Sequence, residues 1–249
     1  MKRVKLVVAY DGTNYCGWQV QKNGETIESV LNRAIGELTG EEIHVMGSSR
    51  TDAGVHACGN VAVLDTEARM AADKFSYALN QRLPEDIRIQ DSCEVPADFH
   101  PRFQKTVKTY EYRILNREFP LPAYRFNSHF TYRKLDVERM RQAAAYLIGE
   151  HDFQSFCAAG AQVKTTVRTI YALDVEKQGD LIILRITGNG FLYNMVRIIA
   201  GTLMKIGQGD WEPERIPEIL AGCDRQLAGP TAPAKGLTLM EIHFKGEKG

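Results

Sequence analysis

The sequence predicts an α+β protein made of two ferredoxin-like β-α-β-β-α-β halves, with mixed, mainly antiparallel sheets joined around a central cleft. Three observations support this fold class. Short β-branched segments alternate apolar and polar residues, which is typical of strands. Longer segments repeat apolar residues at helical spacing. The order of these segments in the first half returns in the second, which suggests an internal duplication. Ligand sites often lie between two such units.

The first half, residues 1–103, holds six elements in the expected order. Residues 2–10 alternate and are β-branched, so they predict a strand. Residues 26–39 repeat apolar residues every three or four positions, and Gly40 is a typical helix stop. The remaining expected elements are strands over 43–48 and 59–65, a helix over 72–83 that Pro84 ends, and a strand over 87–94.

The second half, residues 104–249, repeats this order with longer connections. The sequence Lys-Gln-Gly-Asp at 177–180 is good turn chemistry and predicts a hairpin. The expected elements are a strand over 106–115, a helix over 136–148, strands over 167–176 and 181–187, helices over 191–206 and 214–220, and a final strand over 236–244. The sequences of the halves do not obviously match, so the duplication rests on element order. We expect two α+β domains with these bounds.

The composition is that of an ordinary globular protein, with 249 residues, 44% hydrophobic and 25% charged. Five widely spaced cysteines include no Cys-x-x-Cys pair, which predicts reduced thiols in the cytoplasm. Six histidines form no His-x-x-x-His or Cys/His cluster, so we expect no metal site. No segment reaches the ~18 apolar residues of a membrane span, and the N-terminal residues indicate a strand rather than a signal peptide.

The charges are unevenly distributed although the formal net charge is zero. Residues 100–200 hold 15 Lys or Arg against 9 Asp or Glu, whereas residues 1–99 hold 10 against 15. A basic middle segment fits a surface that follows phosphates. A solvated face without a partner fits the same composition, so charge alone does not decide between them.

A polar loop at residues 47–57 separates two strand-like segments and is longer than a plain hairpin needs. Long polar loops on a sheet often carry function. Asp52 lies two positions from Arg50, so both can face one site, where an arginine would keep the carboxylate ionised. Gly54 permits a positive φ or a close approach to a ligand. We interpret Asp52 as a nucleophile, although this spacing also fits a surface loop with an ordinary ion pair.

Two residues of the second half are candidates to complete a site. Alternation places Tyr110 on the same strand face as Lys108 and Tyr112, where it could stack a nucleobase; an aromatic packed under a helix is the commoner outcome. Arg197 lies in a very apolar helical segment, and burying its charge alone would be costly. It should therefore pair with a carboxylate, reach a ligand, or extend its head into water.

Three segments resemble motifs of the TruA-type tRNA pseudouridine synthases. The first is Arg50-Thr-Asp-Ala-Gly-Val-His-Ala57, and this chain has Ser49 where family members commonly have glycine. The second and third are residues 108–113 and residues 191–202. Weaker likenesses follow in the family's order at 151–156, 168–170 and 232–239, so the resemblance extends over nearly the whole chain.

This resemblance implies the pseudouridine synthase fold and an isomerase that converts uridine to pseudouridine at positions 38–40 of the tRNA anticodon stem-loop. It makes Asp52 the nucleophile and Arg50 a substrate-binding arginine. It also implies that Tyr110 stacks on the target base, that Arg197 pairs with Asp52, and that Leu237 lies near the base. The implied partners are tRNA and a second copy of the chain in a cytoplasmic homodimer, with no cofactor, metal or membrane.

Two other classes of protein compete with this interpretation. A non-catalytic RNA-binding module can share the β-α-β-β-α-β order, but no strand here shows the aromatic-rich RNP1 pattern. A glycoside hydrolase usually needs two carboxylates, and the central loop offers only Asp52. Asp11 and Glu111 are further carboxylates that no motif pairs with it.

Overall fold

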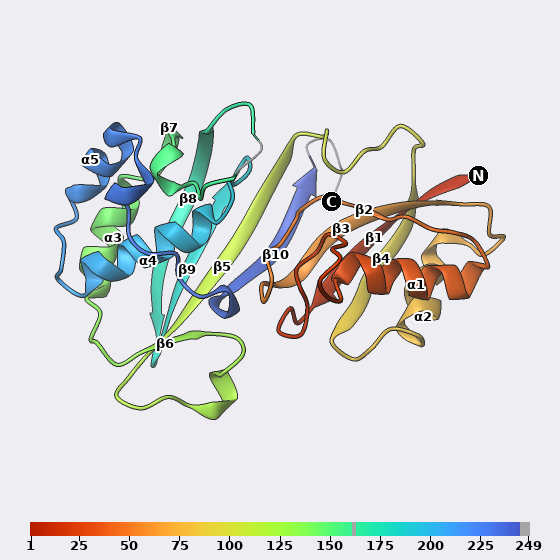
Figure 1. The fold of residues 1–249 in the computed structure, drawn as a ribbon, viewed down its shortest axis with the longest axis horizontal. Helices are drawn as coiled ribbons and strands as arrows, with labels where there is room; N and C mark the ends of the chain where they lie inside the picture. Colours follow the sequence, from red (N-terminus) through yellow and green to blue (C-terminus); the bar gives the residue numbers. More distant parts are fainter. Residues whose placement is uncertain (161–162, 245–249) are drawn as a thin grey trace. The chain divides into compact units, whose positions relative to one another are not determined.

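The computed structural model describes residues 1–160 and 163–244 (Figure 1). The chain divides into two compact units, the first formed by Met1–Lys105 with the end of the chain from Leu239, and the second by Thr106–Thr238. Both units are mixed α+β with mainly antiparallel strands, which confirms the predicted fold class. The last strand lies, from Leu239 onward, in the first unit. That residues 1–103 and 104–249 form two domains stays a prediction.

The first unit has the ferredoxin-like arrangement. Its elements are β1 (Lys2–Tyr10), α1 (Ile27–Thr39), β2 (Met46–Gly47), β3 (His56–Thr66), α2 (Phe75–Asn80) and β4 (Ile87–Val95). The sheet has the order β4-β1-β3 with β2 also on β3, and these pairings are antiparallel. The order 4-1-3-2 is the one that interleaved β-α-β units produce, so the predicted topology of this half is confirmed. The strand β10 (Leu237–Phe244) also neighbours β3.

Helix α1 forms where its spacing predicts because both ends are capped. The side chains of Thr26 and Ser29 each accept a hydrogen bond from the other residue's backbone N–H, which makes a capping box. Gly40 ends the helix in the left-handed conformation, at φ 74°. The buried residues form one face of the helix: Ile27, Val30, Leu31, Ala34 and Ile35.

Helix α2 is shorter than the predicted span of residues 72–83. Residues Ala72–Lys74 form a 3-10 turn, and the α-helix ends at Asn80. The Asn80 side chain accepts a hydrogen bond from the N–H of Ile89 and donates one to its carbonyl, both at 2.8 Å. These two bonds tie the helix end to β4, and Pro84 disfavours helical backbone at the residue before it.

The second unit contains three of the four strands predicted for the second half, and two short strands that were not predicted. Its elements are β5 (Thr106–Asn116), β6 (His129–Thr131), α3 (Val137–Ala145), β7 (Gly149–Asp152), β8 (Val167–Gln178), β9 (Leu181–Gly188), α4 (Met195–Gly207) and α5 (Arg215–Gly222). The sheet has the order β5-β9-β8-β7, with β6 parallel to β5. Strands of three or four residues, such as β6 and β7, are too short to show alternation in a sequence.

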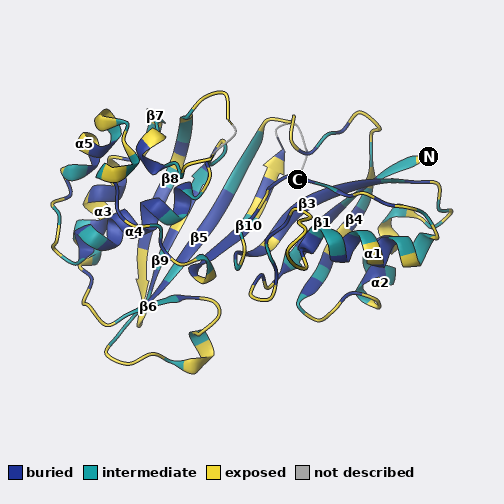
Figure 2. Ribbon diagram, in the orientation of Figure 1, coloured by how far each residue is buried: buried dark blue, intermediate teal, exposed yellow. Residues whose placement is uncertain are grey.

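Helix α4 begins at Met195, four residues later than predicted. Asn194 has φ 59°, a left-handed conformation that asparagine tolerates better than most residues. The segment before it forms a turn, in which Met195 N–H donates to the Leu192 carbonyl at 3.0 Å. From there the helix is almost entirely buried and forms part of the core of this unit (Figure 2).

Gly201 lies where a later segment crosses directly over α4. A Cβ atom at this position would overlap the carbonyl oxygen of Pro230. The next residue, Thr202, accepts a hydrogen bond from Gly229 N–H at 2.9 Å, which holds the two backbones together. Only glycine leaves room for this approach.

Gly201→Ala should destabilise the protein by about 1–3 kcal/mol, because the added methyl group meets a backbone oxygen that cannot move aside. Urea unfolding followed by circular dichroism measures the change. Gly222→Ala in α5 is the matched control, because its Cβ would meet only the end of the flexible Leu227 side chain and alanine is the better helix former. Equal losses in the two variants would contradict this explanation.

Candidate active site

The loop between β2 and β3 holds the candidate nucleophile at its centre. Asp52 is half-buried, while Ser49 and Thr51 are buried and Arg50 is exposed. The N–H of Val55 donates to the Asp52 carbonyl at 3.1 Å, and Gly54 has φ 76°. Asp52 therefore occupies the first position of a tight turn whose third residue has positive φ, which is the requirement of a type II turn. The expected special backbone at Gly54 is confirmed.

A buried polar network holds the residues that precede Asp52. The Tyr10 hydroxyl and the Thr51 hydroxyl are hydrogen-bonded at 2.7 Å. The Asn60 amide donates to the Tyr10 hydroxyl at 3.2 Å and to the Ser49 carbonyl at 3.0 Å, and its oxygen accepts from the Ser49 N–H at 3.3 Å. Since buried polar groups are costly unless they are paired, this network favours one loop conformation.

Ser49 fits this conformation without the glycine that is common in the resembling family. Its backbone has no positive φ, since among the described residues only Asn194 and Cys223 combine a side chain with positive φ. Both of its backbone polar groups pair with the Asn60 amide. A serine is therefore sterically compatible with the loop.

The segment after β1 packs against the loop backbone to backbone. Trp18 N–H donates to the Thr51 carbonyl at 3.0 Å, and Gly54 N–H donates to the Tyr15 carbonyl at 3.4 Å. At Gly17, which has φ 86°, a Cβ atom would lie 2.6 Å from the Thr51 carbonyl oxygen. No sequence motif indicates this segment, which is a structural support of the site.

Asp11 and His56 join the end of β1 to the start of β3. Nδ1 of the buried His56 lies 3.1 Å from Oδ1 of Asp11 and 3.1 Å from the Gly12 nitrogen. Thr13 donates two hydrogen bonds to Asp11, from its N–H at 3.0 Å and its hydroxyl at 2.5 Å. Partial burial acts to raise the pKa of Asp11, but these bonds and the charge of His56 bring it below its ordinary value.

Two arginines lie close together beside the loop. Arg102 Nε donates to the Gly47 carbonyl at 2.8 Å, and Ser48 Oγ donates to the Pro101 carbonyl at 2.9 Å. Burial and then the charge of Arg50 lower the pKa of Arg102, while Glu28 acts to raise it. Arg102 is therefore a second cation beside Arg50, and no sequence motif had indicated it.

The predicted residues of the second unit lie around the segment that leads into β10. Arg197, half-buried in the first turn of α4, donates from Nε to the Ala232 carbonyl and from Nη1 to Oδ1 of Asn194, both at 2.7 Å. Tyr112, buried on β5, donates to the Pro233 carbonyl at 2.9 Å. Leu237, which begins β10, is buried.

Tyr110 is buried on β5, opposite Ile186 of β9. Its ring meets the ring of Phe191 edge to face, with centroids 5.2 Å apart and an interplanar angle of 84°. An edge-to-face partner fixes the plane of an aromatic ring. The contact with Phe191 limits the orientations that the buried Tyr110 ring can take.

The described residues contain no group of three or more His, Cys, Asp or Glu side chains placed to hold a metal ion. All five cysteines, which fall within the described ranges, are in the thiol form. A search of the same residues finds no helix with the length and apolar character required to span a membrane.

Comparison with known proteins gives matches over nearly the whole chain. The family model of tRNA pseudouridine synthase matches residues 6–104 and 143–245. Relatives called tRNA pseudouridine synthase A occur in Acetivibrio thermocellus (48% identical), Ruminiclostridium cellulolyticum (49%) and Brevibacillus brevis (51%), each over 98% of this chain and 100% of the relative. A solved structure of an H/ACA RNP bound to a substrate RNA containing 2′-deoxyuridine matches 95% of this chain and 45% of that chain at 12% identity, and its TM-score of 0.34 is too low for any inference.

Asp11→Asn should reduce the loss of stability that acid causes. The folded pKa of Asp11 lies below its ordinary value of 3.8, so its charge stabilises the fold fully above that value, and this contribution disappears as the pH falls through the folded pKa. Urea midpoints of wild type and variant should differ at about pH 6 and converge as the pH falls below the folded pKa of Asp11. Asp174→Asn, which changes an exposed carboxylate on β8, is the control. Parallel midpoint curves for wild type and Asp11→Asn would contradict the expectation.

Proposed function

The chain belongs to the tRNA pseudouridine synthase family, and we propose that it isomerises uridines 38–40 in the anticodon stem-loop of tRNA with Asp52 as the nucleophile. The match of the family model and the relatives of about 50% identity support the reaction class. The conformation of the Asp52 loop supports the choice of nucleophile. The proposal includes a cytoplasmic homodimer, because the motifs resemble those of a family for which this is expected.

The reaction rearranges one nucleoside without a net change of atoms. The bond between N1 of uracil and C1′ of ribose breaks, the base turns, and C5 bonds to C1′. The hydrogen at C5 leaves and N1 gains one, so no oxidant or reductant is consumed. The protein must supply a nucleophile, hold the freed base and exclude competing water.

The single observation that carries the proposal is the anchoring of Asp52. The residue before it is held by the Tyr10 hydroxyl and by Trp18 N–H, and the turn after it is closed by Val55. A half-buried carboxylate at the start of a rigid turn does not have to reorganise when the substrate binds, which lowers the barrier of the chemical step.

The other residues take roles that fit their surroundings. We assign base stacking to Tyr110, whose ring plane Phe191 holds, and contact with the base to Leu237. A uridine in a stem must be flipped out before it can react. Arg50 and Arg102 are two adjacent cations that suit the backbone phosphates of such a nucleotide. Arg197 is assigned to the substrate site, and its pairing with Asp52 stays a prediction.

The carboxylates that a glycoside hydrolase would need as a second catalytic group are already engaged. Asp11 accepts two hydrogen bonds from Thr13 and lies against His56. Glu111 is buried and pairs with Arg113 and Arg185. The lowered pKa of Asp11 is also the opposite of what a general acid requires.

Asp52→Ala should abolish turnover, with a loss of roughly a thousandfold or more, because no other group can replace the nucleophile. Release of tritium from tRNA that carries 5-³H-uridine measures the reaction, since pseudouridine formation expels the hydrogen at C5. Asp73→Ala, on the 3-10 turn before α2, is the control and should release tritium at the wild-type rate. Near-wild-type release by Asp52→Ala would exclude the assignment.

Tyr110→Phe should retain far more activity than Tyr110→Ala if the ring acts by stacking. Removal of an aromatic stacking partner costs about 1–3 kcal/mol per base, whereas loss of the hydroxyl leaves the π face in place. The two kcat/KM values from the same tritium assay decide this. Equal losses would show that the hydroxyl, not the ring, is what the reaction uses.

A further inference from the structure

Residues 119–135, which lie between Glu118 and Asp136 in the connection from β5 to α3, have an unusual composition. These 17 residues include five Phe or Tyr and three Lys or Arg, and no Asp or Glu. The loop before β6 stands out from the rest of its unit (Figure 1). Three of the aromatic side chains of this segment are exposed: Phe119 to 67%, Phe126 to 45% and Tyr132 to 72%. Aromatic residues are enriched at binding surfaces, so this segment is a candidate for one.

Part of this segment forms a surface with Lys235, which we call the Arg125 surface and define as Tyr124, Arg125, Phe126 and Lys235. The guanidinium carbon of Arg125 lies 4.1 Å from the centre of the Phe126 ring. Arg125 Nη1 donates to the Pro122 carbonyl at 3.1 Å, and Lys235 Nζ donates to the Arg125 carbonyl at 3.1 Å. The hydrogen bonds hold the stacked pair and bring a second cation beside it.

Arg125 differs in its ion pairs from another arginine of the same segment. Arg133, in the same segment, pairs with Asp210 at 2.7 Å. Arg125 has no carboxylate partner within the described ranges of the chain. Burial and then the charge of Lys235 lower the pKa of His129, so this surface also disfavours a further positive charge. An anion that reached the Arg125 surface would relieve this crowding.

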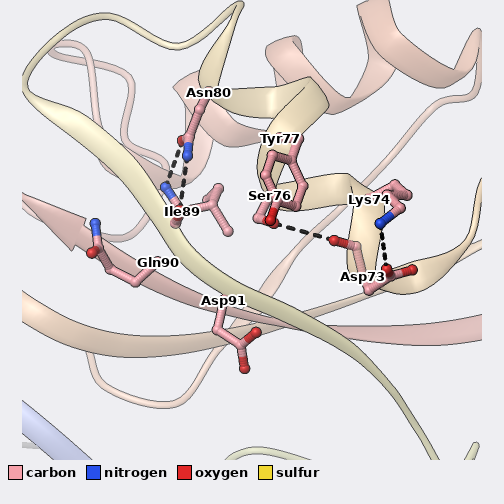
Figure 3. Close-up of a pocket in the computed structure, with 8 residues that line it drawn as sticks. All are labelled: Asp73, Lys74, Ser76, Tyr77, Asn80, Ile89, Gln90 and Asp91. Carbon is pink, nitrogen blue, oxygen red and sulfur yellow. Dashed lines mark hydrogen bonds and ion pairs between the residues drawn. The ribbon is translucent and has the colours of Figure 1, made fainter.

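A second aromatic–cation pair, on α2 of the first unit, provides a contrast. Lys74 Nζ lies 5.5 Å from the centre of the Tyr77 ring, at a hollow of about 350 Å³. The hollow is also lined by Asp73 and Asp91, and Asp73 pairs with Lys74 at 2.8 Å (Figure 3). Here the cation is neutralised and the carboxylates would repel a phosphate. An exposed ring and a cation are present at both places, but carboxylates line the hollow and none of the four residues that define the Arg125 surface is a carboxylate.

We propose that the Arg125 surface binds unpaired nucleotides of the tRNA, with one base stacked on the Arg125–Phe126 pair and one phosphate held by Lys235. Guanidinium and aromatic planes stack bases, and nearby cations hold the phosphates. This inference rests on the proposed function, because it deepens the description of the same substrate. Lys235 lies two residues before Leu237, so the bound nucleotides would lie near the base that we assign to Leu237.

The test measures tRNA affinity of the full chain over a range of salt concentrations. Phe126→Ala should raise Kd about tenfold, equivalent to ~1.4 kcal/mol, and Phe126→Tyr should keep near-wild-type affinity because the ring remains. Lys235→Ala should lower the slope of log K against log salt by about 0.7, the value for one phosphate contact on a single strand. The matched controls, Tyr77→Ala and Lys74→Ala, should change neither quantity.

Two results would overturn the proposal. One is a Kd for Phe126→Ala equal to that of Tyr77→Ala. The other is a Phe126→Ala variant that sediments as a smaller particle than wild type but keeps the wild-type tRNA affinity per subunit. The Arg125 surface would then be an interface between copies of the chain. Failure of the proposed function is distinguished by the tritium assay, in which wild type would bind tRNA without releasing tritium. The comparison of tRNA affinities among the variants would still test the Arg125 surface.

Discussion

The hydrogen bonds among Tyr10, Thr51 and Asn60 are the constraint on which the candidate site depends. They are made by side chains of β1, the loop and β3, and they exist only because these strands are neighbours in the sheet. The register of β1 and β3 shifts between Val8 and Tyr10, where Val8 faces Asn60 and Tyr10 faces Ala57. A bulge of this kind turns a side chain from its regular direction, and bulges are common next to active sites.

The rest of the first unit follows from that arrangement. The segment after β1 lies directly on the loop, and its glycines permit the contact: a Cβ atom at Gly12 would overlap the Val55 carbonyl, and one at Gly17 would approach the Thr51 carbonyl. The Asp11–His56 pair closes the same region from the side. The loop is therefore supported on several sides by groups that are either buried or backbone, which is how a polar connection can hold a reactive carboxylate in place.

The second unit uses the same means to hold its candidate residues. The segment from Ala232 to Leu237 accepts hydrogen bonds from Arg197 and Tyr112, so a helix and a strand both fix its path. At Gly236 a Cβ atom would lie 2.7 Å from the Tyr112 ring. In each unit a functional side chain lies beside backbone that cannot shift without breaking buried hydrogen bonds. The net charge of the chain is zero, but its charges are unevenly placed. Residues 119–135 contain no carboxylate, whereas Asp65 and Asp210 elsewhere in the chain pair with arginines.

Local patterns in the sequence determined much of this protein. Apolar periodicity and end caps define α1, alternation defines β1, and turn chemistry defines the hairpin of β8 and β9, because each depends on residues close together in the chain. The motif around Asp52 was visible for the same reason. Tertiary structure alone decided the late start of α4, the end of α2 at Asn80, and the compatibility of Ser49 with the loop. It also decided the support of the site, since Tyr10 and Asn60 are 50 residues apart and Arg102 lies 55 residues from Gly47. Such contacts depend on which strands become neighbours, and no local pattern in the chain records that.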